Sequence, residues 1–269
     1  MSELIFDIET VPDVELCREV LHLPAELSTE EVMTALRVEQ GVTANKVWAP
    51  LACHQVVAIS LVFAQGDTVK ITSLGEEHSS EQELIEKFFA GIEHYQPMLV
   101  SWNGSGFDLP VLQYRALKHG VVSEHYWDVG ETDSRYRYNN YLNRYHYRHF
   151  DLMDVLSGYQ QRAAMKLDTI AKMLKLPGKM SIDGSQVFAT YLQGGITKIR
   201  DYCELDVLNT YLIFLRLQYC RGKFTKNAYQ QRMDALKQKL QSEPHKAHWQ
   251  AFLAEWESLS SPMEVAVSF

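Results

Sequence analysis

The sequence predicts a mixed α/β domain followed by a helical extension. Three segments with the apolar or alternating character of strands come early in the chain: residues 4–10, 56–63 and 69–74. A fourth apolar segment, 98–101, lies between two segments with helical spacing. Strands followed by helices, with one strand between the helices, are typical of a mixed sheet flanked by helices. We therefore expect such a domain over residues 1–221 and a helical extension over 222–269.

The composition is that of an ordinary globular protein. The chain has 269 residues, of which 46% are hydrophobic and 22% charged. Its apolar runs are shorter than the roughly eighteen residues of a membrane span, and its first residues lack the regions of a signal peptide. The scattered cysteines predict neither a disulfide framework nor a zinc site, and they fit a reducing cytoplasm best. They are Cys17, Cys53, Cys203 and Cys220.

The net charge of −8 counts against a nucleic-acid binder, because such proteins gain much of their affinity by neutralising phosphates. It does not exclude one. Acids gathered to hold metal ions add to the negative total, and a local basic patch can coexist with them. A nucleic-acid function therefore requires such a patch to be found.

The first half of the chain carries helix and turn signals between the strands. Residues 11–50 form an insertion between two strands, and Ser28 with Glu31 has the spacing of a capping box for a helix that ends near Glu39. Residues 65–67, Gln-Gly-Asp, supply the turn of a three-stranded meander. Ser80 and Glu83 form a second capping box, before an amphipathic helix. The strand 98–101, the glycine-rich turn 102–106 and a helix from 107 to about 118 follow.

The second half is helical after an irregular segment. Residues 126–149 are expected to form a loop rich in tyrosine and arginine, and 150–156 a strand that passes into a helix. Helices are expected at 167–174 and at 197–218. Between them, Asp183 and Gln186 are expected to cap a helix that ends at 192. One or two further helices are expected within 225–257.

Asp7 and Glu9 lie two residues apart on the first strand, so both side chains leave the same face. Two like charges on a buried strand are costly unless a cation neutralises them, and hard cations prefer carboxylate oxygens. An Asp-x-Glu pair by itself is more often a solvated entry to a turn. The metal interpretation therefore needs support from elsewhere in the chain.

Two further segments supply acids. Asp108 follows the glycine-rich turn at the start of a helix, and Asp206 lies in the long helix with Tyr202 one turn before it. Each residue also has an ordinary interpretation. Asp108 could interact with the helix dipole, Tyr202 could be a core residue, and Asp206 could pair with Arg200 or Lys198.

In this order the segments resemble a known family. Asp-Ile-Glu-Thr (7–10), Asn-Gly-Ser-Gly-Phe-Asp-Leu-Pro (103–110) and Tyr-Cys-Glu-Leu-Asp (202–206) are similar to the three motifs of the DEDDy 3′–5′ exonucleases. The relatives are the proofreading domains of family B DNA polymerases and the stand-alone PolB-like predicted 3′–5′ exonucleases. The resemblance covers about 4–214 and implies a ribonuclease H-like (DnaQ-like exonuclease) mixed sheet flanked by helices.

The resemblance implies a two-metal site. Asp7, Glu9, Asp108 and Asp206 would hold two divalent cations, Mg²⁺ or Mn²⁺, about 3.5–4 Å apart, that activate a water and stabilise the departing 3′-oxygen. Tyr202 would orient that water, and Glu9 would lie near the terminal 3′-hydroxyl. Thr10, Asn103 and Phe107, within or beside these motifs, are candidate contacts to the terminal nucleotide, with core packing as the alternative for Phe107. Asp151 and Asp154 are interpreted as local helix caps.

The tyrosine- and arginine-rich segment has two interpretations. Its arginines could contact phosphates while its tyrosines stack on unpaired bases. Alternatively, it is a packed loop whose tyrosines cover the core and whose arginines pair with the protein's own acids. The arginines concerned are Arg135, Arg137, Arg144 and Arg148.

The predicted function is metal-dependent 3′–5′ exonuclease activity, on single-stranded DNA ends in the first instance. A 3′–5′ exoribonuclease with the same site is the alternative, because contacts to the 2′-position decide the sugar. A catalytically silent nucleic-acid-binding module is a third hypothesis, which the intact set of acids disfavours. A proofreading role would require a separate polymerase as partner.

Overall fold

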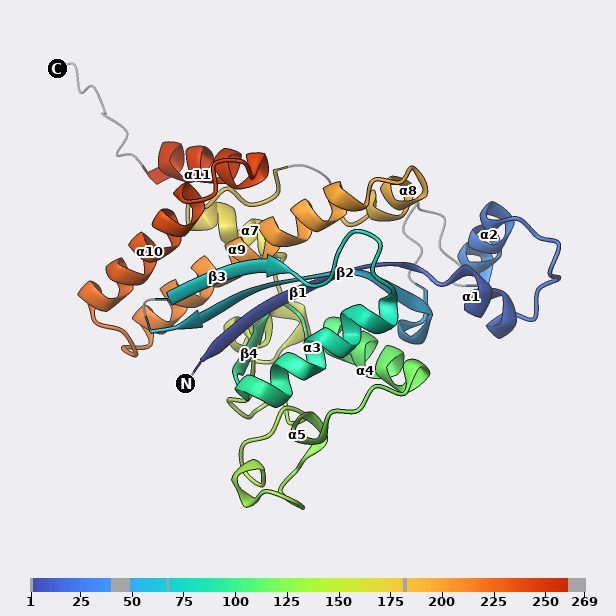
Figure 1. Cartoon of the computed structure of the whole chain (residues 1–269), viewed down its shortest axis with the longest axis horizontal. Helices are drawn as coiled ribbons and strands as arrows, with labels where there is room; N and C mark the ends of the chain where they lie inside the picture. Colours follow the sequence, from blue (N-terminus) through green and yellow to red (C-terminus); the bar gives the residue numbers. More distant parts are fainter. Residues whose placement is uncertain (1, 40–48, 67, 181–182, 261–269) are drawn as a thin grey trace.

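The computed structural model describes residues 2–39, 49–66, 68–180 and 183–260. Its centre is a five-stranded sheet in the order β3-β2-β1-β4-β5 (Figure 1). The strands β1, β2 and β3 form the predicted antiparallel meander, while β4 and β5 run parallel to β1. The strands are β1 (Glu3–Pro12), β2 (His54–Gln65), β3 (Thr68–Ser73), β4 (Met98–Ser101) and β5 (His149–Asp151).

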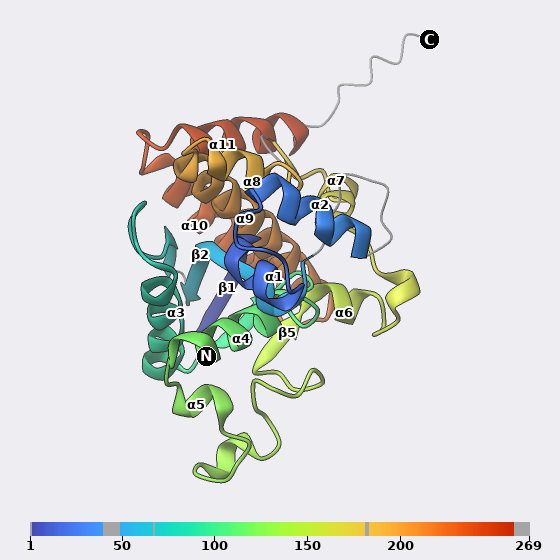
Figure 2. The ribbon, with the colours of Figure 1, turned by 90° about the vertical axis from the view of Figure 1, so that its right-hand side faces the viewer.

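Helices cover both faces of the sheet, as Figures 1 and 2 show. On one face α3 (Glu81–Tyr95) and α4 (Asp108–His119) pack against Leu4, Phe6 and Ile8 of β1. On the other face lies α9 (Ile196–Cys220), the long helix predicted from the sequence. Because strand side chains alternate, the odd-numbered residues of β1, including Asp7 and Glu9, face α9.

The C-terminal helices share the core of the domain. The helices α10 (Lys226–Gln241) and α11 (Ala247–Ser260) contribute Leu236 and Trp249 to the same apolar cluster as the middle of α9. The other helices are α1 (Val14–Val20), α2 (Thr29–Glu39), α5 (Glu124–Trp127), α6 (Leu152–Leu156), α7 (Leu167–Met173) and α8 (Val187–Leu192). Short 3₁₀ helices occupy Leu51–Cys53, Ser134–Tyr136 and Gln161–Ala163.

The capping box at Ser28 is confirmed, and at Ser80 the N-cap half of the predicted box is. The hydroxyl of Ser28 accepts from the N–H of Glu31, whose carboxylate accepts from the N–H of Ser28, and Ser80 caps α3 in the same position. The start of α8 differs from the prediction. Asp183 and Gln186 form a turn, and the helix begins only at Val187.

The first strand is longer than predicted. A bulge between Glu9 and Thr10 shifts the register, and the strand then continues through Val11 and Pro12, which lie opposite Gln55 and His54. The excursion between β1 and β2 therefore starts at Asp13, and its residues 40–48 lie outside the described residues. Among the described helices, none has the length and apolar character needed to cross a membrane.

Candidate active site

The two acids of β1 lie beneath α9 and close to each other. Ligand atoms of Asp7, Glu9 and Cys203 lie within 4.8 Å of one another. The Cys203 Sγ lies 3.4 Å from the carbonyl oxygen of Asp7 and 3.6 Å from its Oδ2. This group joins the first and third sequence motifs, which are almost two hundred residues apart in the chain.

Asp108 reaches the same place from the other face of the sheet. β1 pairs with β4 only over Glu3–Ile5, so the N–H groups beyond Ile5 need another acceptor on that side. Asp108, the first residue of α4, supplies one: its Oδ1 accepts from the N–H of Ile8 at 3.2 Å. Asp108 is 4% exposed, so this hydrogen bond is shielded from solvent.

The glycine-rich turn before Asp108 is held by Asp151. One carboxylate oxygen of Asp151 accepts from the N–H of Asn103 at 3.0 Å, and the other from the N–H of Ser105 at 2.8 Å. Asp151 also caps α6, as predicted. A Cβ on Gly104 would lie 2.2 Å from the Ser101 hydroxyl, so only glycine fits there.

The long helix supplies Tyr202 and Asp206, which form a hydrogen bond with each other. The Lys179 Nζ lies 5.6 Å from the centre of the Tyr202 ring. Its loop is fixed to α9 by Asn209, whose side-chain amide exchanges two hydrogen bonds with the backbone of Gly178. Arg200 donates instead to the carbonyls of residues 74–76, so it is not engaged with Asp206 as one interpretation of the sequence suggested.

Burial and mutual repulsion disfavour the ionised forms of these acids. Burial, followed by repulsion from Asp108 and the neighbouring acids, raises the pKa of Asp7 well above its usual range. Burial and the charges of Asp206 and Asp108 do the same for the pKa of Glu9. Burial raises the pKa of Asp108 to about 7 and that of Asp206 to about 6, although the hydrogen bond from Tyr202 and the nearby Lys179 counteract the effect for Asp206.

This donor set suits hard divalent cations. Three buried carboxylates and the partly buried Asp7, with charges that repel, are what Mg²⁺ or Mn²⁺ would neutralise, and oxygen is the donor that these ions prefer. The fifth neighbour, the thiol of Cys203, is a softer donor that suits other metals. The carboxylate part of the site therefore fits the predicted ions.

Comparison with protein families identifies the chain. A family described as "Predicted 3'-5' exonuclease related to the exonuclease domain of PolB" matches residues 46–256. The chain belongs to this exonuclease family. The matched range begins after β1, so Asp7 and Glu9 are assigned from the sequence motif and from their geometry rather than from this match.

Known proteins that resemble parts of the exonuclease are DNA polymerases. DNA polymerase 1 of Sulfurisphaera ohwakuensis is 30% identical over 117 residues, which are 38% of this chain and 13% of that polymerase. The DNA polymerase of Archaeoglobus fulgidus is 25% identical over 161 residues, 59% of this chain and 19% of the polymerase. The exonuclease thus spans less than a fifth of these relatives.

Among solved structures, the family B DNA polymerase from the hyperthermophilic archaeon Pyrobaculum calidifontis is similar to 80% of the exonuclease and 25% of that polymerase. The sequence identity is 18% and the TM-score 0.47.

Two of the three predicted nucleotide contacts, Thr10 and Phe107, lie against the same histidine. The Thr10 hydroxyl forms a 2.9 Å hydrogen bond with Nδ1 of His54, and the ring of Phe107 packs edge-on against the same histidine. Phe107 also packs partly against the core, the alternative that the sequence left open. Asn103 has a left-handed φ of 66° in the turn that Asp151 holds.

The contacts within the tyrosine- and arginine-rich segment follow the packed-loop interpretation, while contact with nucleic acid stays a prediction. Arg148 is 7% exposed, lies against the rings of Tyr136 and Tyr141, and donates to a backbone carbonyl, which argues against a phosphate contact there. Arg144 forms two 2.8 Å bonds with Asp154, which is therefore an ion-pair partner rather than a helix cap. Arg135 pairs with its neighbour Asp133 and stays largely exposed, as does Arg137.

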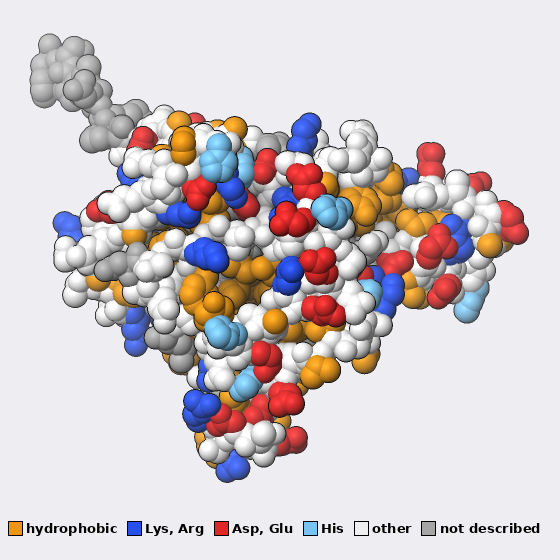
Figure 3. Space-filling model, in the orientation of Figure 1, with side chains coloured by type: hydrophobic (Ala, Val, Ile, Leu, Met, Phe, Trp, Pro, Cys, Tyr) orange, Lys and Arg blue, Asp and Glu red, His pale blue; other side chains and the backbone are white. Residues whose placement is uncertain are grey.

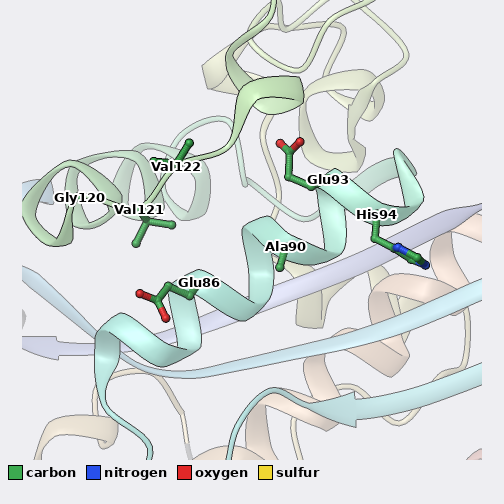
Figure 4. Close-up of a pocket in the computed structure, with 7 residues that line it drawn as sticks. All are labelled: Glu86, Ala90, Glu93, His94, Gly120, Val121 and Val122. Atoms are coloured by element: carbon green, nitrogen blue, oxygen red, sulfur yellow. The ribbon is translucent and has the colours of Figure 1, made fainter.

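A separate hollow lies on the opposite side of the sheet. It measures about 520 Å³ and lies between α3 and the residues after α4 (Figure 4). Glu86 and Glu93 border it, but Glu93 already accepts hydrogen bonds from Ser123 and His125. None of the four predicted metal ligands lines this hollow.

Two neighbours of the site were not predicted. Cys203 was expected only as an interior residue of α9, although it precedes Asp206 by three residues and therefore shares its side of the helix. Lys179 follows the Pro-Gly pair that ends the α7 segment, and nothing in its local sequence distinguishes it from other lysines. Only the fold brings it to Tyr202.

Proposed function

We propose that the chain is a metal-dependent 3′–5′ exonuclease that hydrolyses phosphodiester bonds at single-stranded DNA ends and releases mononucleotides. The observation that supports this most is the pair Asp7 and Glu9, whose ligand atoms lie within 4.8 Å of each other and whose pKa values are raised in part by the charges of Asp108 and Asp206. Among the residues that the structure describes, no lysine or arginine forms an ion pair with any of the four. We further propose that the mixed sheet is of the ribonuclease H-like class.

The four carboxylates would hold two divalent cations together with the substrate phosphate. Ions bound there supply charge neutralisation of the phosphate and of the departing 3′-oxygen, and they lower the pKa of an attacking water. Asp7 and Glu9 would contribute from β1, Asp108 from the start of α4 and Asp206 from α9.

Two other side chains of the chain act on the water and the phosphate. The Tyr202 hydroxyl is fixed by its hydrogen bond to Asp206, and we assign to it the orientation of the attacking water. Lys179 supplies a positive charge that already favours the ionised forms of Glu9 and Asp206, and it would also attract the scissile phosphate.

The test uses end-labelled oligonucleotides. Single-stranded DNA, duplex DNA and RNA carrying a 5′ label are incubated with Mg²⁺, with Mn²⁺ and with chelator. We expect a ladder of products shortened from the 3′ end that requires metal and forms fastest on single-stranded DNA. A faster ladder on RNA would instead assign the exoribonuclease alternative.

The Asp7→Ala variant separates this site from a contaminating nuclease. Its ladder should be lost under the conditions in which the wild-type protein degrades the oligonucleotide. Full activity in Asp7→Ala would exclude the assigned site, and no metal-dependent product from the wild-type protein would overturn the proposed function.

A further inference from the structure

A second cavity lies along α9, outside the acid cluster. It has a volume of about 290 Å³ and lies among α6, α7 and the C-terminal half of α9. Its lining is almost entirely apolar and includes one tryptophan, three methionines and two aliphatic residues of α9: Trp102, Met153, Met165, Met173, Ile213 and Leu217. Met165 and Met173 are 52% and 67% exposed, so the cavity opens to solvent on this side.

Two elements that line this cavity also lead to acids of the candidate active site. On α9, Asp206, Ile213 and Leu217 are separated by seven and four residues, so they follow one stripe of the helix. At 1.5 Å per residue, Ile213 lies about 10 Å along the axis from Asp206. Trp102 begins the turn that leads to Asp108, and the chain after α7 leads to Lys179.

The surroundings of the cavity are basic in a chain of net charge −8. Residues 159–180, which include α7, contain five basic residues and a single acid. All five basic side chains are exposed: Arg162, Lys166, Lys172, Lys175 and Lys179. Arg216 lines the cavity itself. By contrast, acidic side chains are frequent over α2 and α3 on the face in Figure 3.

We propose that this cavity holds a base of the single strand upstream of the terminal nucleotide, while the surrounding cations contact the phosphates on either side. This inference rests on the proposed exonuclease function, because it assigns the path of the same substrate. The cavity would act as a second contact that favours strands long enough to reach from the acid cluster to Trp102 and Met173.

The chemistry of the cavity favours a nucleic acid over an apolar peptide as its occupant. Aromatic side chains stack on any base, and methionine adapts to planar groups of different shape. The basic residues attract a polyanion, whereas a peptide held only by apolar contacts would not require basic residues around the cavity. Charge complementarity therefore favours single-stranded nucleic acid, rather than an apolar peptide, as the occupant of the cavity.

The test compares substrates of increasing length. Catalytic efficiency is measured for oligodeoxyadenylates from two to ten nucleotides, and for decamers with a single abasic site at each position. For the wild-type protein we expect a stepwise gain once the strand reaches the cavity. An abasic site at that position should lower the efficiency by about five- to a hundredfold, the range expected for one stacked base.

The double variant Met165→Glu with Met173→Glu places two negative charges at the mouth of the cavity. Its ratio of decamer to dinucleotide efficiency should fall toward one, and its sensitivity to the abasic position should disappear. The matched control is Leu117→Glu with Val122→Glu, which adds the same charge at apolar positions that are 81% and 79% exposed on and after α4. The control should keep the wild-type ratio.

The outcomes separate the two proposals. If the wild-type protein cleaves the dinucleotide but shows no length step, the cavity is not a base site while the exonuclease function stands. If the Met165→Glu, Met173→Glu variant keeps the wild-type ratio, or loses activity equally at every length, the inference is also overturned. If the wild-type protein cleaves none of the oligonucleotides, the proposed function itself fails.

Discussion

Glu204 and Asp206 are two residues apart on α9, and both are buried, yet their surroundings are opposite. Burial opposes the ionisation of Glu204, but hydrogen bonds from His248 and the charge of Lys246 outweigh it and lower the pKa of Glu204 to about 2. Burial raises the pKa of Asp206 to about 6. The same helix thus carries one carboxylate that the fold stabilises and one that it does not.

The partners of Glu204 come from the C-terminal helices. Its carboxylate accepts from the Trp249 indole and from His248, both at 2.8 Å, and from Lys246 at 3.2 Å. These contacts attach the start of α11 to α9, so Glu204 stabilises the fold. Among the described residues, no lysine or arginine forms an ion pair with the acid cluster on the other side of α9, and the proposed cations would supply the missing positive charge.

The largest expected effect is the loss of activity in Asp206→Asn. The substitution keeps the shape of the side chain but removes a carboxylate ligand, and metal ions supply several kcal/mol of transition-state stabilisation. We therefore expect the hydrolysis rate to fall by about a thousandfold or more in a single-turnover assay, with the far-UV circular dichroism unchanged. A loss of tenfold or less would mean that Asp206 does not hold an essential ion.

The matched substitution Glu204→Gln should affect stability instead. It removes the anionic partner of Lys246 and one of the two acids beside His248, and the loss of such a buried charged hydrogen-bond network costs about 3 kcal/mol. Urea denaturation should detect this as a lower midpoint, while metal-dependent hydrolysis by the folded variant persists. Equal stability of Glu204→Gln and the wild-type protein would remove the distinction between the two carboxylates.

A further expected effect is the dependence of the free energy of unfolding on pH. In the metal-free protein the pKa values of Asp108 and Asp206 are about 7 and about 6, above the ordinary value of 3.8. Between about pH 4 and pH 7 the folded state therefore binds more protons than the unfolded chain, so the stability contributed by these groups is lost as the pH rises. At about 1.36 kcal/mol per pKa unit, we expect the free energy of unfolding with chelator to fall by about 4 kcal/mol from pH 5 to pH 8.

Asp206→Asn provides the control for this pH effect. Because it removes one of the repelling carboxylates, the variant should be more stable than the wild-type protein at pH 8 in chelator, and its stability should depend less on pH. A wild-type stability that rises from pH 5 to pH 8 would contradict the raised pKa values.

The smallest expected effect concerns the exposed arginines. The measurement is the affinity for single-stranded DNA at several salt concentrations, plotted as log affinity against log salt concentration. Replacing Arg135, Arg137 and Arg144 by Gln should make this slope less steep, by at most about one unit for each phosphate that an arginine neutralises in the wild-type protein. Arg144 already pairs with Asp154, so its contribution should be the weakest of the three. An unchanged salt slope would remove this segment from the binding surface.

The sequence predicted those parts of the site that depend on local periodicity. The period of two in a strand places Asp7 and Glu9 on one face, and the period of the helix places Tyr202 beside Asp206. The capping box at Ser28 and the N-cap at Ser80 were likewise readable, because cap and partner lie three residues apart.

The features that the sequence did not predict depend on contacts between distant segments. The continuation of β1 past Thr10 requires a bulge that only the pairing with β2 defines. Arg148 was a candidate phosphate contact with a packed loop as the alternative, and its burial depends on the rings of Tyr136 and Tyr141 around it. The anchoring of Glu204 by Trp249 joins residues that are 45 positions apart.

The most direct test of the shared cation site is calorimetric titration of Mn²⁺ into the metal-free protein at pH 7, for the wild type and for Asp7→Asn. We predict binding to the wild-type protein with release of protons, because carboxyl groups with raised pKa values must ionise to hold the ion. Asp7→Asn should bind at least roughly tenfold more weakly. Equal Mn²⁺ affinity in the two proteins, or binding without proton release, would contradict a site built from these four carboxylates.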